Sequence, residues 1–250
     1  IYRHLWTRPI TVTTDVWSAT VTATTTLGTA AAMNSAMTYP APTGATQPSF
    51  SPAIFNAGTS ITVSLPRQVG TYTHDVLYSF GSINNAVLAT GQGTSYTFTP
   101  ALSLSTEIPN AVEAPYTITA ITRTAAGAEV GRLSYTGTLR VPTSQAPTVS
   151  AYAASDTNTL VAAQVGAFVQ TLSVLRLDSV TATGKQGATI ADRRLTIEGQ
   201  DLALTGTRAL FNAGTIPVTA RAWDSRGYEG TLGGNVTVLA YAPPIVGTVL

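Results

Sequence analysis

Alternating polar and apolar residues run through most of this chain and constrain its fold more than any other feature. In segments such as 60–65 (SITVSL), 116–121 (YTITAI) and 236–241 (VTVLAY), β-branched, aliphatic and aromatic residues alternate with smaller or polar ones. A period of two in residues of this kind is typical of strands that bury one face. Only residues 27–37, rich in alanine, predict a helix, of about two turns. We therefore expect an all-β protein.

Clusters of turn-forming residues divide the expected strands into two groups of similar size. Their spacing predicts two tandem immunoglobulin-like or fibronectin III-like β-sandwiches, module 1 over 47–145 and module 2 over 146–244. A short β-ribbon and linker (1–46) precede them, and a tail (245–250) follows. The expected strands are 10–13 and 17–22 in the ribbon; 60–65, 74–80, 95–99, 116–121 and 133–141 in module 1; and 148–152, 172–177, 180–183, 194–197, 218–223 and 236–241 in module 2. The expected turns in module 1 are 67–70, 84–85, 91–93 and 125–127.

Few residues are charged, only 10% of the chain against about 25% in typical soluble domains. A net charge of +1 predicts no nucleic-acid partner, and no run of about 18 apolar residues predicts a membrane helix. The absence of cysteine excludes disulfides, thiolate metal sites and a cysteine nucleophile. We expect neighbouring subunits to cover much of such a weakly charged surface.

A series of short phrases points to a family. Residues 72–81 (YTHDVLYSFG) and 94–100 (TSYTFTP) come first, and module 2 continues with 166–170 (GAFVQ), 187–190 (GATI), 222–228 (AWDSRGY) and 241–244 (YAPP). In this order they resemble a family of siphovirus minor structural proteins from the tails of phages that infect Gram-positive bacteria. The resemblance covers about residues 47–244. It implies immunoglobulin-like modules in a tail or tail-tip assembly, and no catalytic residues.

Candidate catalytic groups are few. His4 and His74 are the only histidines that could act as the base of a Ser-His-Asp triad. His74 and Asp75 are neighbours in an expected strand, so their side chains would project to opposite faces. We interpret His74 as a hydrogen-bonded residue at a module surface. Two histidines without cysteine also argue against a structural zinc site.

The acidic residues are scattered, and Asp192, Glu198 and Asp201 lie closest together, around an expected hairpin. Two carboxylates can hydrolyse a glycosidic bond, but no aromatic cleft motif brackets any pair here. We therefore interpret these three as solvated turn residues. No Asp-x-Asp-x-Asp pattern predicts a calcium site.

Three short motifs have simpler structural interpretations. Residues 224–227 (DSRG) look like an integrin-type adhesion motif, but we expect a tight turn in which Gly227 takes a positive φ and Arg226 pairs with Asp224 or a backbone carbonyl. Residues 91–93 (GQG) are too short for a phosphate-binding loop, and the glycosylation sequon at 235–237 lies in an expected strand. Four aromatic residues could stack on sugars, but in alternating strands we expect them in the core: Trp6, Trp17, Trp223 and Tyr78.

Together these features predict a non-enzymatic structural component of a phage virion, a tail or tail-tip protein that contributes to assembly and host attachment. Its expected partners are other tail proteins, further copies of the chain and a host cell-surface glycan, with no membrane insertion, metal or cofactor. No ligand-binding residue can be assigned. The alternatives are a carbohydrate-binding adhesin module on a viral or bacterial surface, a virion decoration protein and, least favoured, a glycan-degrading enzyme.

Overall fold

The computed structural model describes residues 19–23, 31–35 and 44–243. In the first segment β1 (Ala19–Ala23) pairs antiparallel with β2 (Ala31–Ser35). The prediction of a helix over 27–37 is therefore wrong where it overlaps β2, because strand pairing overrides a weak helix propensity. Four features predicted for this region lie outside the described residues: the strand at 10–13, His4, Trp6 and Trp17.

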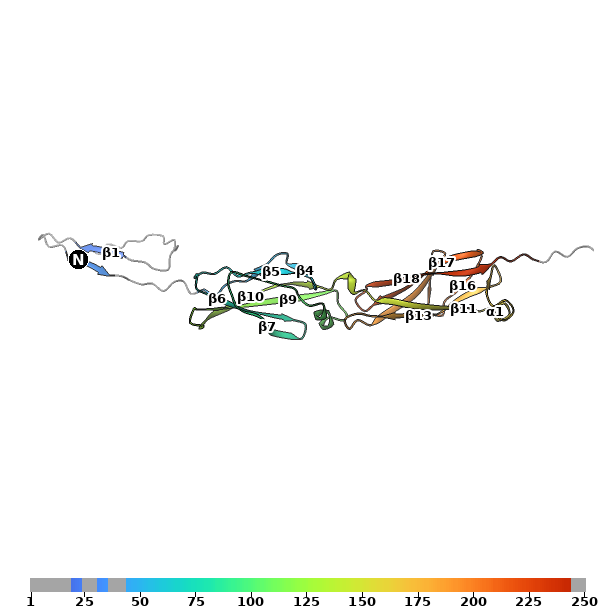
Figure 1. Ribbon diagram of the computed structural model, residues 1–250, viewed down its shortest axis with the longest axis horizontal. Helices are drawn as coiled ribbons and strands as arrows, with labels where there is room; N and C mark the ends of the chain where they lie inside the picture. Colours follow the sequence, from blue (N-terminus) through green and yellow to red (C-terminus); the bar gives the residue numbers. More distant parts are fainter. Residues whose placement is uncertain (1–18, 24–30, 36–43, 244–250) are drawn as a thin grey trace, which may run out of the picture.

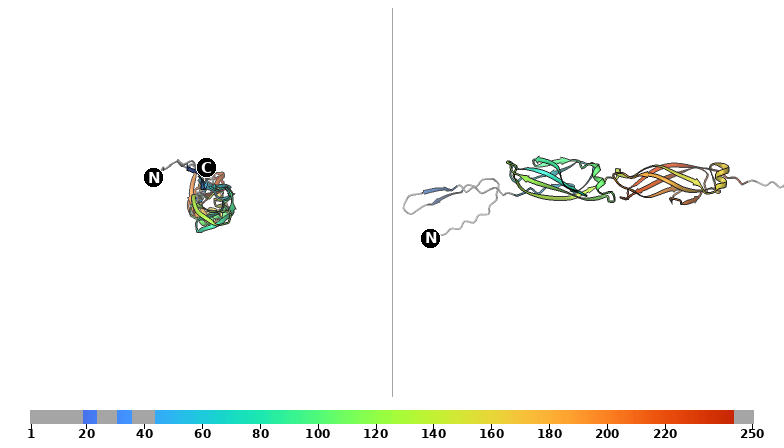
Figure 2. Two further views of the ribbon diagram at one scale, coloured as in Figure 1. Left: turned by 90° about the vertical axis from the view of Figure 1, so that its left-hand side faces the viewer. Right: turned by 90° about the horizontal axis from the view of Figure 1, so that it is seen from below.

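Residues 44–243 form two β-sandwiches that follow one another end to end (Figure 1, Figure 2). Each combines a five-stranded and a three-stranded sheet, and the all-β prediction is confirmed. In module 1 the larger sheet runs β4 (Ile54–Asn56), β10 (Glu129–Arg140), β9 (Glu113–Arg123), β6 (Thr73–Phe80) and β7 (Ile83–Gln92); the smaller one runs β3 (Ser49–Phe50), β5 (Ile61–Ser64) and β8 (Ser95–Phe98).

Module 2 repeats this strand order. Its larger sheet runs β12 (Phe168–Val169), β18 (Glu229–Leu239), β17 (Gly214–Asp224), β14 (Ile190–Ile197) and β15 (Gln200–Ala203); its smaller one runs β11 (Thr148–Asp156), β13 (Val174–Thr183) and β16 (Thr207–Ala209). In both modules the chain crosses from the smaller sheet to the larger one near its start and pairs there in parallel with the last strand. The two modules are thus two copies of one immunoglobulin-like topology.

Each sandwich encloses its own core, filled in a different way. The core of module 1 is rich in aromatic rings, with Tyr116 surrounded by Phe55, Tyr78, Phe80 and Phe98 at centroid distances of 5.5–6.2 Å. The buried core of module 2 is aliphatic. Its fully buried large side chains are Leu175, Leu177, Leu195, Ile197 and Leu210.

Other predicted elements differ in detail. The expected strands at 172–177 and 180–183 merge into the one strand β13, which begins only at Val174, because a bulge at Asp178 absorbs the break in alternation. Residues 84–85 lie inside β7, and the turn before it is formed by Gly81 and Ser82. Two short 3₁₀ helices were not predicted, η1 (Leu102–Glu107) and η2 (Thr143–Gln145), nor was the helix α1 (Thr159–Val165). Within the described part of the chain, no helix is both long and apolar enough to cross a bilayer.

Candidate functional site

The junction between the modules is the most extensively bonded polar site of the structure. The turn between β17 and β18 of module 2 contacts the segment around η1, between β8 and β9 of module 1. Ser225 Oγ donates to the carbonyl of Pro109 at 2.6 Å, and the Tyr228 hydroxyl donates to the carbonyl of Val141. Lys185 Nζ adds a bond of 3.1 Å to Ser144 in the connecting segment.

Arg226 lies at the centre of this junction, with its side chain fully buried. Its guanidinium donates to two carbonyls of module 1, Ser105 at 2.8 Å and Ile108 at 3.3 Å. It also donates to two carbonyls of module 2, Lys185 at 3.0 Å and Gln186 at 2.6 Å. Because the guanidinium is planar and rigid, these four bonds hold the two modules in one relative orientation.

Asp224 holds the turn in the shape that presents Arg226. Its Oδ1 accepts hydrogen bonds from the backbone N–H groups of Arg226 and Tyr228, and Gly227 takes a φ of 84°. Its other oxygen lies 3.9 Å from Arg226 Nη1, so the buried cation has a nearby counter-charge. The expected tight turn is present, with Arg226 near Asp224 and bonded to backbone carbonyls, but those carbonyls lie partly in the other module.

The corresponding turn of module 1 has the same backbone without these side chains. Gly127 N donates to Thr124 O at 2.9 Å and has a φ of 85°. In module 2 the equivalent bond joins Gly227 N to Asp224 O, also at 2.9 Å. Aligning the two turns places alanine opposite each of the three bonding residues: Ala125 for Ser225, Ala126 for Arg226 and Ala128 for Tyr228. The turn of module 2 is therefore specialised for contact with a preceding module.

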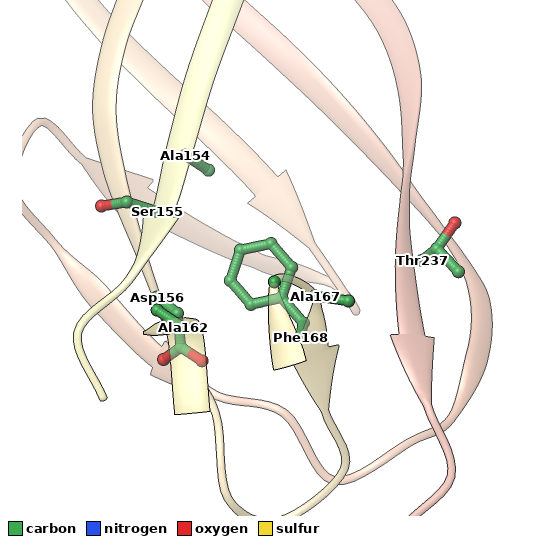
Figure 3. Close-up of a pocket in the computed structure, with 8 residues that line it drawn as sticks. Ala154, Ser155, Asp156, Ala162, Ala167, Phe168 and Thr237 are labelled. Carbon is green, nitrogen blue, oxygen red and sulfur yellow. The ribbon is translucent and has the colours of Figure 1, made fainter. Parts of the chain in front are cut away.

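The opposite end of module 2 contains a pocket of about 400 Å³ (Figure 3). It opens where the chain crosses between the sheets. In module 1 that crossing consists only of residues 51–53, whereas in module 2 it spans 157–167 and includes α1. Figure 3 shows Asp156 and Ala154 on β11, Phe168 on β12 and Thr237 on β18 around the pocket. The insertion thus gives module 2 a hollow beside α1.

Asp156 is anchored by one carboxylate oxygen only. Its Oδ1 accepts from the backbone N–H groups of Asn158 at 2.9 Å and Val174 at 3.0 Å. Its Oδ2 is withdrawn from solvent and accepts no hydrogen bond. The adjoining helix α1 starts at the side chain of Asn158 and ends at Gly166, whose φ is 67°. Since α1 buries none of its residues, few contacts hold it against this carboxylate.

Exposed apolar side chains gather around the same end of module 2. The side chain of Gln170 links two neighbouring segments there, since it bonds to Phe211 O and Tyr241 N. Most of the exposed large apolar residues of this module belong to α1, to the loops beside it or to the end of β18: Leu160 at 76%, Phe211 at 63%, Val165 at 47%, Leu239 at 43%, Tyr241 at 40% and Leu172 at 37%. Apolar groups concentrated in this way are typical of a contact surface.

His74 is buried rather than at a module surface. Its Nδ1 lies 2.8 Å from the carbonyl of Gly93, and its Nε2 lies 2.7 Å from Thr46 Oγ1. Its exposed fraction is 0%. The expectation of hydrogen bonding is met, but the expected surface position is wrong, because the segment that leads into module 1 covers the ring. Both nitrogens are engaged, which leaves neither free for proton transfer to a substrate.

The three clustered carboxylates each have a separate partner. Asp192 pairs with Arg194, Glu198 with Arg208, and Asp201 accepts from Thr196. Glu198 lies in the β14–β15 turn, but its side chain is only 13% exposed, so the prediction of a solvated residue is wrong for it. Hydrogen bonds from Arg208 and then Asn212 hold the pKa of Glu198 below its usual range. No group of three or more metal-ligating side chains occurs in the part of the chain that the structure describes.

The two described aromatic candidates differ in position. Tyr78 packs against the core of module 1 and stacks on Tyr116, with ring centroids 5.5 Å apart. Trp223 is only partly buried and belongs to neither core. It lies on the outer face of β17, where the Arg194 guanidinium sits 5.7 Å from the ring centroid. The core prediction for Trp223 is wrong because the alternate residues of β17 point inward, and these are Ile216, Val218, Ala220 and Ala222.

Comparison with family models matches residues 42–248 to a family described as "Siphovirus protein of unknown function (DUF859)". The chain belongs to this siphovirus protein family. The match covers both sandwiches and begins after the N-terminal ribbon, as the ordered phrases indicated. Membership makes this a phage protein and is consistent with a structural role in the virion. No curated protein matches the chain.

Solved structures with a similar fold include fibronectin III-like and immunoglobulin-like modules. One is the structure of the fibronectin(III)-like modules of Clostridium thermocellum CbhA, with 17% identity, a TM-score of 0.31 and coverage of 78% of this chain and 95% of that one. Another is the mouse nectin-like molecule 4 ectodomain, with 14% identity, a TM-score of 0.28 and coverage of 80% and 66%. A third is chicken VE-cadherin EC1-2, with 14% identity, a TM-score of 0.29 and coverage of 74% and 96%.

Proposed function

We propose that this siphovirus protein is a non-enzymatic structural component of the phage tail or tail tip, in which the two modules act as one stiff spacer. The observation that carries the proposal is the buried Arg226, whose hydrogen bonds reach both modules at once. An assembly component that must hold its ends at a fixed distance requires such a junction. A flexible linker between domains would allow them to move independently.

The surface chemistry supports contact with neighbouring subunits. Eight ion pairs neutralise most charged side chains within the described residues, so little charge remains to repel a neighbour. The apolar end of module 2 around Phe211 and Leu160 offers a surface for association. Other tail proteins and further copies of the chain are the partners that we propose.

Electron microscopy of intact virions labelled with antibody against residues 44–243 tests this role. We expect the label on the tail, and a label at the distal tip would support a part in host attachment. A label on the head would refute the tail assignment and favour a decoration protein. Absence of the chain from purified virions would refute a structural role altogether.

A second candidate function is a carbohydrate-binding adhesin, and the pocket beside α1 is the observation that favours it. The pocket lies at one end of a sandwich, where loops of this topology can vary without disturbing the core. A glycan-array screen of the purified chain, repeated on virions, tests this function. Binding that is lost when α1 is replaced by a short loop would support it, and no binding in either form would refute it.

A further inference from the structure

The pocket of module 2 contains a carboxylate with no cation beside it. Among the acidic residues that the structure describes, most are in ion pairs, and Glu107 and Asp201 accept hydrogen bonds from hydroxyl groups. Asp156 has neither kind of partner for its Oδ2, although it lies in the wall of an open pocket. A buried carboxylate oxygen without a donor is costly, and a charged donor relieves that cost most effectively.

The rest of the pocket suits a small organic body attached to such a donor. Phe168 offers an aromatic ring, Ala154 and Ala162 offer methyl groups, and Thr237 offers a hydroxyl. An aromatic face attracts a cation as well as C–H groups. A volume of about 400 Å³ lies at the lower end of the range for small-molecule sites, so the pocket has room for one sugar unit or one long side chain.

We propose that this pocket binds a primary ammonium group, carried by an amino sugar or by a lysine side chain, with the ammonium on Asp156 and the carbon skeleton against Phe168. Because Asp156 Oδ2 is covered in the free protein, the pocket wall must open for the ammonium to reach it. An opening at the adjoining helix α1 would be inexpensive, because α1 buries no residue. The proposal goes beyond the spacer role and does not depend on it, since every residue that carries it belongs to module 2.

Nuclear magnetic resonance titration of the full chain with three probes tests the site. The probes are glucosamine, N-acetylglucosamine and Nα-acetyl-lysine, each up to about 100 mM, a range suited to millimolar affinity. We expect glucosamine, Nα-acetyl-lysine or both to shift the amide signals of Asp156, Ala162 and Phe168. N-Acetylglucosamine, which has no ammonium, should not shift them. The response to the two cationic probes distinguishes a sugar from a peptide as the source of the group.

Asp156→Asn is the decisive variant. It keeps Oδ1 as an acceptor for the two backbone N–H groups but removes the charge, so we expect affinity for the cationic probes to fall at least about tenfold. Asp192→Asn is the matched control, because Asp192 lies outside the pocket and pairs with Arg194; this variant should bind as the parent does. Should Asp156→Asn lose the dispersed spectrum of a folded chain, Phe168→Leu replaces it and should weaken binding by removing the aromatic face.

Two results would overturn the proposal. The first is the absence of shifts at these amides with both cationic probes. The second is equal binding by N-acetylglucosamine or by Asp156→Asn, which would mean that the carboxylate plays no part. Neither result bears on the junction at Arg226, so the spacer role would stand or fall separately.

Discussion

Replacement of Arg226 by alanine should uncouple the two modules. Two of its four hydrogen bonds cross the junction, to Ser105 and Ile108. At about 1.5–3 kcal/mol for each charge-assisted bond, their loss weakens docking by about 3–6 kcal/mol. The carbonyls of Ser105, Ile108 and Lys185 each keep a backbone N–H donor after the substitution, whereas the carbonyl of Gln186 loses the donor that Arg226 supplies. Docking of the turn would then depend mainly on Ser225 and Tyr228.

Residual dipolar couplings measure this effect directly, because rigidly joined modules share one alignment tensor. We expect one tensor for the parent chain and two different tensors for Arg226→Ala. Tyr228→Phe removes a single bond across the junction and should give a smaller change, without touching the contacts of Arg226 inside module 2. Arg176→Ala, which removes an exposed pair within module 2, is the matched control and should keep one tensor. A shared tensor in Arg226→Ala would refute the assignment of Arg226 as the residue that fixes the orientation.

Three further perturbations test the folded state, each by urea denaturation. Gly230→Ala should lower the free energy of unfolding by about 1–3 kcal/mol, because a Cβ there would collide with the carbonyl of Pro147 in the connecting segment. Gly233→Ala, which has open space around the added methyl group, should lower it much less. His74→Phe should lower the free energy of unfolding by about 1–3 kcal/mol, because the carbonyl of Gly93 loses a partner and Thr46 Oγ1 keeps only its bond to Pro66 O. A change under about 0.5 kcal/mol would contradict the bonding described. The lowered pKa of Glu198 predicts a contribution to stability that is present above its unfolded pKa, about 4.3, and is lost as pH falls through the lower folded pKa. Glu198→Gln should remove that part of the dependence of the unfolding free energy on acid pH. An unchanged pH profile would count against the pair with Arg208.

The alternating pattern was sufficient to predict the strands that bury one face. The expected strand at 95–99 and the observed β8, like the expected strand at 74–80 and the observed β6, differ by one residue at an end. Strands in which polar and apolar residues alternate less regularly were missed. Residues 83–92 form an edge strand whose register against β6 shifts three times, so its side chains show no clean alternation and its two asparagines resemble a turn.

The sequence contains only weak indications of the helix α1. Asn158 and Gly166 are typical start and stop residues, but the segment between them buries none of its residues and therefore lacks the apolar stripe that marks a helix in a sequence. The pocket beside it was missed for the same reason, since it exists only because this insertion separates β11 from β12. A comparison of the lengths of the two crossings could have revealed it.

The sequence predicted one part of the junction and missed the other. Residues 224–227 predicted a turn and a bond from Arg226 to a backbone carbonyl, and both are present. That the bond reaches Ser105, far away in the chain, depends on the stacking of the modules, which no local pattern encodes. The contrast with Ala125, Ala126 and Ala128 becomes meaningful only when the two turns are known to be equivalent.

Cryo-electron microscopy of the intact virion tests most directly whether this chain is a stiff component of the tail. We predict density on the tail into which both sandwiches fit as one rigid body, in line and with the turn of Arg226 against Ser105 and Ile108. Density for the two modules at a different relative orientation, or a particle whose tail contains no such density, would contradict this function.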